Sequence, residues 1–507
     1  MTDWRDAVLV GVEPLLASDP TPLVAVEDAD PTPLVAVEEA DPTDDGPEEP
    51  ASVAGDTVWV GHGRIGRADV VVASWDFRVH GGSFGERDAT AFVAACAEAA
   101  TTRRPLVSML RSGGTRLQEG MRALVGIPRA LLALDQLARA GVPHIAVADH
   151  PSTGGVWVAI GATADLRIGV SGATVGFSGP RVIEAMTGVA VPRGTNTAES
   201  AEVAGLLDAV VAPERLATWL ENALVTLRPD EPRPTVPPVP VGVPDRSGWQ
   251  QVERSRDGDR PGGAELLEAL LDDSLFAEGS ADAPLPARPV HLRCGDDSVS
   301  AAVGRLGGHR VVLVALTARR AGRATPRGYG LLSRSAELAG RLDLSCVVLV
   351  DTAGADPLPL SEQAGIAPAI AAAMSAMLRC PAPTLAVVHG EGGSGGALAG
   401  AVTDCVAITE NGWFAALGPE GAAATLRISP EQAADLMGVA PRDLLGSGFA
   451  DALAPADADG LRAWTAARLD GLRAVEPADR LARRHARWST ALPGSSVSSS
   501  PDSPDIA

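Results

Sequence analysis

Two long stretches of the chain share one pattern of hydrophobic runs, glycine-rich loops and helical segments. In the first stretch the apolar run PLVSML leads into SGGTRLQEG, and in the second CVVLV leads into DTAGADPLP. Each loop is followed by a helical stretch, a second apolar run (PHIAVAD or TLAVVHG), a double glycine, a short small-residue helix and a third apolar run (ADLRIGV or DCVAITE). Buried strands that alternate with helices favour a parallel sheet covered on both faces. The pattern therefore predicts an α/β fold built from two pseudo-symmetric domains.

The two stretches keep a nearly constant register along the chain. Four landmarks recur at separations of 239 to 241 positions: Gly114 and Gly354, Pro143 and Pro383, Gly154 and Gly395, and Pro180 and Pro419. Chance rarely preserves such spacing over four landmarks. The two halves are therefore expected to be copies of one β-α unit.

Changes in composition predict the domain boundaries. An acidic arm holds an eleven-residue tandem copy, DPTPLVAVEDA followed by DPTPLVAVEEA, and its composition is typical of disorder. The run RPDEPRPTVPPVPVGVPDR favours an extended linker, and the leucines of GGAELLEALL repeat at helical spacing, which predicts a helix packed on a domain surface. The predicted divisions are the arm at 1–54, the first domain at 55–227, the linker and short helix at 228–289, the second domain at 290–475, and a helical end with a disordered tail at 476–507.

Composition and charge narrow the class of protein. An apolar fraction of 46% with only 3% aromatic residues suits helices packed on buried strands. The net charge is −22, and residues 1–56 hold fifteen acidic residues against one arginine. Nucleic acid is not an expected partner, because its binding requires clustered positive charge. No apolar run approaches membrane-spanning length and no leader-like segment opens the chain, so we expect a cytoplasmic protein without a membrane partner.

The chain contains no lysine, so all 42 basic residues are arginine. This absence excludes a phosphate loop that needs lysine, a Schiff-base lysine, and a lysine that carries biotin or lipoate. The five cysteines are scattered without a C-x-x-C pair, and the histidines show no metal-ligand spacing. We therefore expect reduced, mostly buried thiols and no metal. Any lysine-borne cofactor must arrive on another chain.

Glycines between strand and helix are the candidate functional residues. In PSTGGVWVAIGATAD and GEGGSGGALAGAVTD they leave the backbone unprotected, so that N–H groups can approach a ligand. Such groups stabilise the charge that develops on a thioester carbonyl oxygen when its α-carbon loses a proton. Tight strand–helix packing would also explain either motif alone. Their presence in both halves favours two oxyanion sites.

A serine hydrolase is a competing interpretation of the second glycine motif. Residues 392–396 fit the pattern G-x-S-x-G, which would place Ser394 on a nucleophile elbow between strand and helix. Such an enzyme also needs an acid and then a histidine further along the chain. The later histidine is His485, which lies close to the expected tail. The hydrolase therefore stays a weaker alternative.

Several segments resemble a known family. GGSFGERDATAFVAAC, SGGTRLQEG, DHPSTGGVWVAIGATAD and VGFSGPRVIE closely resemble the β-subunit half of bacterial acetyl-CoA carboxylase carboxyltransferase. DTAGADPLPLSEQAG, GEGGSGGALAGAVTD, LGPEGAAATL and EQAADLMGVAPRDLLGSGFAD resemble its α-subunit. Together these segments cover most of residues 56–455 in the expected order. The chain looks like a fused β-α carboxyltransferase, which implies two crotonase-like (ClpP/crotonase) β-β-α superhelical domains in tandem.

The resemblance implies a reaction and a set of site residues. The reaction is transfer of the carboxyl group from carboxybiotin, carried on a separate protein, to the α-carbon of acetyl-CoA or another short acyl-CoA. Decarboxylated biotin can take the α-proton, so the protein need not supply a base. For Arg116, a salt bridge at the rim of the core and a contact with a ligand are equally good explanations. The residues implied are Gly154 and Gly155 for the acyl-CoA enolate, Gly395, Gly396 and Ala397 for the biotin ureido oxygen, and Gly113, Gly114 and Arg116 as further contributors on the acyl-CoA side.

Two features depart from the family pattern. The bacterial β-subunit carries a four-cysteine zinc ribbon, whereas no cysteine precedes Cys96 here. The lack of lysine also rules out a built-in biotinyl domain. Biotin carboxyl carrier protein and biotin carboxylase subunits are therefore the expected partners, together with other copies of this chain in a homo-oligomer. A malonate decarboxylase-type carboxyltransferase, which has similar halves, and an inactive scaffold paralogue are the remaining alternatives.

Overall fold

The computed structural model describes residues 8, 10–15, 56–228, 240–272, 288–317, 323–490 and 492. The tandem repeat of the acidic arm, most of the proline-rich linker and the expected tail lie outside the described residues. Two compact units share the chain. Unit 1 comprises Met1–Arg228 and Ser274–Gly295, and unit 2 comprises Pro229–Asp273 and Asp296–Ala507. The helical part of the linker region thus belongs to unit 2 rather than to a separate connection.

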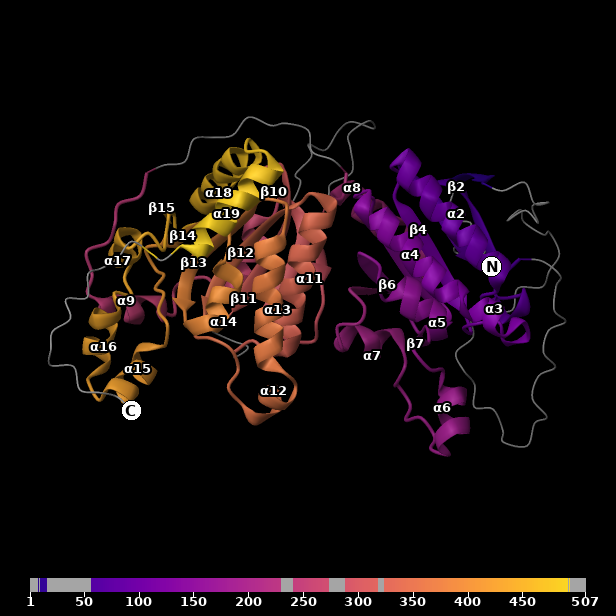
Figure 1. Cartoon of the computed structure of the whole chain (residues 1–507), viewed down its shortest axis with the longest axis horizontal. Helices are drawn as coiled ribbons and strands as arrows, with labels where there is room; N and C mark the ends of the chain where they lie inside the picture. The colour runs from indigo at the N-terminus through magenta and orange to yellow at the C-terminus, as the bar shows by residue number, and fades with distance from the viewer. Residues whose placement is uncertain are drawn as a thin grey trace. The chain divides into compact units, whose positions relative to one another are not determined.

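Unit 1, whose helices carry the labels α2 to α8 in Figure 1, is built on a mixed sheet. The strand order is β1-β2-β3-β4-β5-β6-β8, and the short β7 pairs with β5. The first three strands are antiparallel, and every later pairing is parallel. The strands are β1 (Val10–Pro14), β2 (Val58–Ile65), β3 (Ala68–Trp75), β4 (Leu106–Ser112), β5 (His144–Thr153), β6 (Leu166–Val170), β7 (Val175–Gly176) and β8 (Ala209–Val211).

Helices cover the unit 1 sheet. The longest, α2, is rich in alanine and packs against α4, while α8 contacts β2 and β3. A π-helical stretch, Trp157–Gly161, directly follows α5. The α-helices of unit 1 are α2 (Glu86–Thr102), α3 (Met121–Leu124), α4 (Gly126–Arg139), α5 (Gly154–Val156), α6 (Pro180–Thr187), α7 (Ala198–Val203) and α8 (Leu216–Thr226).

Unit 2 repeats this plan. Its sheet runs in the order β15-β14-β13-β12-β11-β10, with an antiparallel β10-β11 hairpin followed by parallel strands. Every residue of β12 is buried, as expected for a strand with helices on both faces. The strands are β10 (Val299–Leu306), β11 (His309–Thr317), β12 (Ser345–Thr352), β13 (Thr384–Gly392), β14 (Cys405–Thr409) and β15 (Ala452–Ala454); β9 (Val290–Leu292) precedes them.

Helices account for most of the rest of unit 2. On one face of the sheet α10 and α18 meet over β11 and β12, and α11 packs along α13. The helices are α9 (Gly248–Ser255), α10 (Gly263–Leu270), α11 (Pro326–Leu342), α12 (Pro359–Gln363), α13 (Ile366–Arg379), α14 (Ser394–Ala401), α15 (Pro419–Leu426), α16 (Pro430–Met437), α17 (Pro441–Gly446), α18 (Ala458–Arg473) and α19 (Pro477–Ser489).

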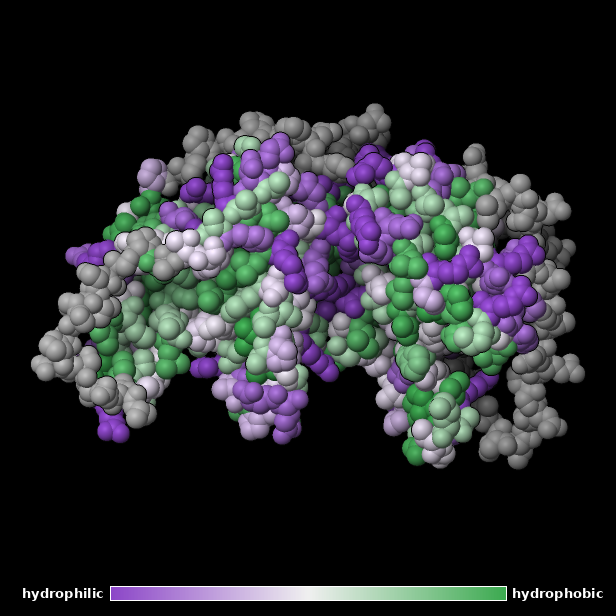
Figure 2. Space-filling model, in the orientation of Figure 1, coloured by the Kyte–Doolittle hydropathy of each residue, from purple (hydrophilic) through white to green (hydrophobic). Residues whose placement is uncertain are grey.

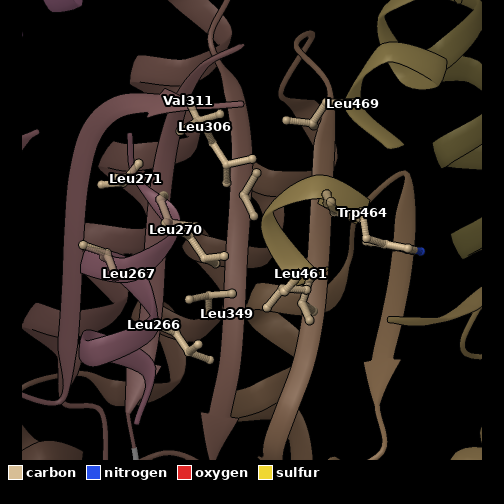
Figure 3. Packing of buried hydrophobic residues seen from close by; sticks show 14 of the residues in the cluster. Leu266, Leu267, Leu270, Leu271, Leu306, Val311, Leu349, Leu461, Trp464 and Leu469 are labelled. Atoms are coloured by element: carbon tan, nitrogen blue, oxygen red, sulfur yellow. The ribbon is translucent and has the colours of Figure 1, made fainter. Parts of the chain in front are cut away.

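The predicted amphipathic helix after the linker is α10, and its leucines are part of the core. They pack against strands β10 to β12 and against α18, as Figure 3 shows. Each is at most 2% exposed. Burial of a leucine side chain contributes about 1.5–3 kcal/mol, so the three leucines of α10 and Leu271 directly after it make this segment integral to unit 2. The residues labelled in this cluster are Leu266, Leu267, Leu270, Leu271, Leu306, Val311, Leu349, Leu461, Trp464 and Leu469.

The two units keep the register that the sequence predicts. The helices α2 and α11 are both 17 residues long, and they begin at Glu86 and Pro326, 240 positions apart. Each sheet also has an irregularity at the same point, where the strand after the long helix meets its neighbour: between Leu110 and Ser112 in unit 1, and between Val350 and Thr352 in unit 2. These shared positions allow residues of the two units to be compared one by one.

The cysteines are free thiols, as the sequence predicts, and four of the five are buried: Cys96, Cys346, Cys380 and Cys405. Burial raises the pKa of Cys96 to about 12, and burial with the nearby Asp451 charge raises that of Cys405 to about 12. These thiols are therefore inert at neutral pH. Within the described residues, no helix has the length and apolarity that a membrane crossing requires.

An exposed apolar surface surrounds α6 of unit 1. In Figure 2, hydrophobic residues gather over this helix, which carries no buried side chain of its own. The exposed fraction is 72% for Phe177, 50% for Val182, 81% for Met186 and 64% for Val189. A contiguous apolar patch of this kind is typical of a protein–protein contact. We call these four residues the α6 surface.

Candidate active site

In unit 1 a tight turn joins β5 to α5 at the first candidate glycine pair. Gly154 has φ +67°, a backbone conformation that disfavours side chains, and its N–H donates to the Phe177 carbonyl at 2.8 Å. A Cβ at Gly154 would lie 2.8 Å from the Gly114 Cα, so two glycine backbones meet there. The turn therefore requires glycine, and the Gly154 N–H is already used within the protein.

Gly155 presents the available amide of this turn. It stands in the first turn of α5, where N–H groups have no acceptor inside the helix. No acceptor for it is found elsewhere among residues 56–228. Its own Cα packs against Ile127, whose Cδ1 lies 2.7 Å from the place that a Cβ would take. Of the predicted pair, Gly155 is thus the one that can donate to a ligand.

The loop after β4 brings the other candidate glycines beside this turn. Gly114 has φ +117°, its N–H is bonded to the Ser112 hydroxyl at 3.1 Å, and its carbonyl accepts the Phe84 N–H at 2.8 Å. The Gly113 N–H donates to the Gly81 carbonyl at 3.3 Å. Both N–H groups therefore hold the loop itself in place.

Thr115 is a residue of this loop that sequence reasoning missed. It forms a parallel bridge with Phe84, in which Gly114 and Arg116 make the hydrogen bonds, so the Thr115 N–H faces the opposite side. Its Oγ1 lies 3.2 Å from the point where a Gly155 Cβ would stand. Thr115 and Gly155 therefore lie next to each other at this turn. The place of Thr115 directly after the landmark Gly114 was the signal that could have identified it.

The structure places Arg116 in a buried network. Its guanidinium contacts Asp88 at 2.6 Å, Glu119 at 2.9 Å and the Thr57 hydroxyl at 2.6 Å. Burial raises the pKa of Asp88, although N–H groups of Gly85 and Val58 and the charge of Arg116 favour its ionised form. Arg116 therefore fixes the loop to the start of α2 through a salt bridge, and a contact with a ligand stays a prediction.

Unit 2 contains the same turn, shifted by one residue from the predicted alignment. Ser394 has φ +58° and donates its N–H to the Ala415 carbonyl at 2.8 Å, as Gly154 does to Phe177. Ser394 rather than Gly395 is thus the counterpart of Gly154, which restores the separation of 240. Only the backbone conformation reveals this alignment, because the sequence does not show that a serine has a positive φ.

The three predicted biotin-side residues lie in the first turn of α14, but they differ in what they offer. Gly395 and Gly396 stand at the start of the helix, and no acceptor for their N–H groups is found among the described residues of unit 2. The Ala397 N–H donates to the Gly393 carbonyl at 3.2 Å. Gly395 and Gly396 can therefore bind an anionic oxygen, whereas the Ala397 amide belongs to the helix.

Ala355 completes this turn as Thr115 completes the other. The preceding Gly354 has φ +126° and its N–H is bonded to the Thr352 hydroxyl at 3.2 Å. Ala355 forms a parallel bridge with Ala324, and its N atom lies 2.4 Å from the point where a Gly396 Cβ would stand. Each unit therefore combines a loop amide with helix amides. Two such donor sets can stabilise two oxyanions without any ionisable side chain.

The nucleophile-elbow interpretation finds no support at Ser394. Its hydroxyl lies against Gly354, 3.1 Å from the place of a Cβ there. His485 lies on α19, where its ring contacts the Leu378 carbonyl at 3.1 Å. In the described part of unit 2, Ser394 makes no hydrogen bond to a histidine. Among the described residues, no group of three histidine, cysteine, aspartate or glutamate side chains is placed to hold a metal ion.

Comparisons with known proteins identify the family. Residues 245–475 match the family model described as acetyl co-enzyme A carboxylase carboxyltransferase-like. A probable biotin-dependent acyl-coenzyme A carboxylase beta3 subunit of Mycobacterium tuberculosis is 33% identical over 86% of this chain and 90% of its own length. Acetyl-coenzyme A carboxylase carboxyl transferase subunits beta/alpha of Salinispora tropica are 35% identical over 79% of this chain and 73% of their own.

Solved structures show the same fold. Transcarboxylase 12S aligns with a TM-score of 0.67 at 24% identity, over 82% of this chain and 81% of that one. A single-chain, multi-domain long-chain acyl-CoA carboxylase aligns with a TM-score of 0.62 at 18% identity, over 82% of this chain and 41% of that one. Both units are therefore crotonase-like. On these similarities, the chain belongs to the carboxyltransferase family of biotin-dependent acyl-CoA carboxylases.

Proposed function

We propose that this carboxyltransferase moves the carboxyl group of carboxybiotin to acetyl-CoA or another short acyl-CoA, giving malonyl-CoA or its homologue. The observation that carries the proposal is the pair of matching turns, each with backbone amides that have no acceptor among the described residues. One turn would serve the thioester, and the other the biotin ureido group.

The chain's own residues supply charge stabilisation at fixed points. On the acyl-CoA side, Gly155 and Thr115 present their N–H groups to the thioester oxygen, where negative charge develops as the α-proton leaves. The partial positive charge at a helix start adds to the α14 amides on the other side. Because these donors are held by the fold, they need little reorganisation during the reaction.

Biotin fits the second donor set by its chemistry. Gly395 and Gly396 offer N–H donors, which suit the ureido oxygen, and a side chain at Gly396 would fill the space between Ala355 and α14. Bound carboxybiotin would supply the transferable carboxyl group and a base for the α-proton. Since the chain has no lysine, a biotin carboxyl carrier protein and a biotin carboxylase are the proposed partners, in the cytoplasm.

A homo-oligomer is part of the same proposal. The α6 surface exposes four large apolar side chains around one helix. Water contact with so much clustered apolar surface is unfavourable, and a second copy of the chain would cover it.

The test is decarboxylation in the reverse direction. Purified protein is incubated with biocytin and malonyl-CoA, methylmalonyl-CoA or a longer carboxyacyl-CoA, and loss of the carboxyl group is followed. We expect biocytin-dependent turnover with at least one thioester, and the preferred one defines the acyl group. Absence of turnover with all of them would refute the proposal and favour an inactive scaffold. Ser394→Ala should keep most activity, whereas a serine hydrolase would lose it.

A further inference from the structure

The chain contains one tyrosine, Tyr329, and it lies beside the biotin-side turn. It stands in the first turns of α11 and its side chain is fully buried. In the part of unit 2 that the structure describes, the hydroxyl has no hydrogen-bond partner. A buried hydroxyl without a partner costs stability, and phenylalanine would fill the same space without that cost. The hydroxyl therefore calls for an explanation.

The hydroxyl lies where the loop after β12 meets the start of α14. A Cβ at Gly396 would be 2.5 Å from the Tyr329 oxygen, 2.4 Å from the Ala355 N and 2.9 Å from the Gly354 carbonyl carbon. The hydroxyl and the Ala355 amide are thus next to each other and next to Gly396. Two neighbouring donors without an acceptor among the described residues of unit 2 are suited to an oxygen atom supplied from outside the protein.

The position in unit 1 that corresponds to Tyr329 carries an apolar side chain. Since α2 and α11 keep the 240-residue register, Ala89 is the counterpart of Tyr329, and Val156 is the counterpart of Gly396. Both Ala89 and Val156 are fully buried. Unit 1 therefore has two apolar side chains at these positions. Unit 2 has a glycine in place of the valine and a tyrosine, with its hydroxyl, in place of the alanine. Packing explains the exchange of volume but not the polar atom.

The phenol remains a donor over the whole physiological range. Burial raises the pKa of Tyr329 well above its ordinary value, and the negative charge of Asp296 raises it further, against a smaller opposing effect of Arg323. The hydroxyl consequently stays protonated.

We propose that the Tyr329 hydroxyl is a hydrogen-bond donor of the biotin-side site and binds an oxygen of the ureido group held at Gly395 and Gly396. This inference rests on the proposed function, because it takes that turn as the biotin side. Tyr329 is fully buried in this structure, so contact between its hydroxyl and the ligand requires a local rearrangement of the loop at Ala355 or of the first turn of α14.

The first test uses the single tyrosine as a reporter. Protein labelled with 3-fluorotyrosine gives one ¹⁹F resonance, and its absence from the Tyr329→Phe variant confirms the assignment. We expect biocytin to shift this resonance and malonyl-CoA alone to leave it in place. An unchanged resonance at biocytin concentrations that saturate turnover would overturn the proposal, because the hydroxyl would then have only a structural role or a bound water as its partner.

The second test separates binding from stability. Tyr329→Phe should raise the KM for biocytin about tenfold, the effect of losing one hydrogen bond, and leave the KM for malonyl-CoA unchanged. Its melting temperature should equal or exceed that of the wild type, since the buried hydroxyl has no partner among the described residues. Ser335→Ala is the matched control, because Ser335 is another buried hydroxyl without a described partner on α11, further along the helix.

The outcomes distinguish the two proposals. If the wild type decarboxylates no thioester in the presence of biocytin, the proposed function fails. If the wild type is active and Tyr329→Phe has the same KM for biocytin, only the role of Tyr329 fails. A rise in KM for Ser335→Ala equal to that for Tyr329→Phe would also overturn the role, because it would show a general effect of α11 rather than a contact with the ligand.

Discussion

At the scale of single residues, the candidate glycines of the two turns fall into two groups, according to whether their backbone N–H groups are hydrogen-bonded within the protein. Gly113, Gly114 and Gly154 use their N–H groups to hold the loops, whereas Gly155, Gly395 and Gly396 keep theirs available. Glycine is needed at Gly154 because of its positive φ, and at Gly396 because neighbouring atoms fill the space. Substitutions of these residues should therefore have different consequences.

Gly396→Ala and Gly395→Ala should differ in stability. A methyl group at Gly396 meets the Ala355 backbone N at 2.4 Å, which cannot move without shifting the loop, whereas one at Gly395 meets only Met374 at 4.0 Å. We expect Gly396→Ala to lower the unfolding free energy by about 1–3 kcal/mol. Gly395→Ala should be at least as stable as the wild type. Urea unfolding measures both, and equal stabilities would contradict the packing described here.

Gly155→Ala should affect activity rather than folding. Its methyl group would meet the end of the flexible Ile127 side chain, which can move aside, so the melting temperature should change by only a few degrees. The added methyl group would also stand 3.2 Å from the Thr115 Oγ1, where it should misplace the bound thioester and lower kcat/KM for the acyl-CoA on the order of 100-fold. Kinetics with varied thioester at fixed biocytin checks this. If this variant has wild-type kinetics, the proposal that Gly155 binds the acyl-CoA is wrong.

The double glycines were recognisable in the sequence, but the state of each amide was not. Whether an N–H is available depends on φ and on a carbonyl far along the chain, such as Phe177 for Gly154 and Ala415 for Ser394. The one-residue shift at Ser394 was missed for this reason. Thr115 was missed because its role arises from the bridge to Phe84.

At the scale of elements, loops are fixed to helices by a few charged contacts. In unit 1, Glu119 joins the loop after β4 to α2, because its carboxylate accepts the Glu86 N–H at 2.7 Å and contacts Arg116 at 2.9 Å. In unit 2, α19 is fastened by Arg484, whose fully buried side chain pairs with Asp404 at 2.6 Å and donates to the Met377 and Ala382 carbonyls.

The Glu119 contact predicts a pH dependence of stability. The Glu86 N–H and, to a smaller extent, Arg116 lower the pKa of Glu119 against the opposing effect of burial. A carboxylate whose folded pKa is depressed stabilises the fold above its unfolded pKa of about 4.3, and this contribution is lost as the pH falls through the folded pKa. In thermal unfolding, the melting temperature of the wild type should exceed that of Glu119→Gln at pH 7. This difference should shrink below about pH 4.3. A constant difference would contradict the prediction.

Arg484→Ala should detach α19. The substitution leaves Asp404 buried without its partner and removes donors from the end of α13, so we expect a loss of about 3–5 kcal/mol. Arg483→Ala is the control, since Arg483 is an exposed neighbour on the same helix, and its effect should stay within about 0.5 kcal/mol. Urea unfolding of both variants measures the difference. Similar stabilities would show that α19 contributes little.

The sequence predicted a helical end near α19 but not its attachment. In the sequence, Arg484 cannot be distinguished from its exposed neighbour Arg483, because only the fold brings Asp404 next to Arg484. The amphipathic α10, by contrast, was predictable because its leucines repeat at helical spacing and must be buried.

At the scale of the whole molecule, the repeat explains why the fold was predictable. Two glycine-rich β-α units at a constant separation, with buried parallel strands, allow few other architectures. The linker segment that carries α9 and α10 belongs to unit 2, which composition alone could not show, because a proline-rich run marks where a chain is extended but not to which core the next helix is bound.

The α6 surface gives a prediction for assembly. Met186→Glu would place a charge in a covered apolar contact, so we expect smaller species in sedimentation than for the wild type. Thr101→Glu adds the same charge at an exposed position on α2 and should leave the assembly unchanged. If Met186→Glu sediments like the wild type, the α6 surface is not the contact between copies.

The attachment of α19 also sets the order in which the units are completed during synthesis. The sheet formed by β1 to β8 ends at Val211, so this sheet can form while most of unit 2 is still to be made. Asp404, by contrast, pairs with Arg484, which is synthesised 80 residues later. A ribosome-bound intermediate would therefore hold a formed unit 1 sheet and a unit 2 with an uncompensated carboxylate. Translation would complete unit 2 last.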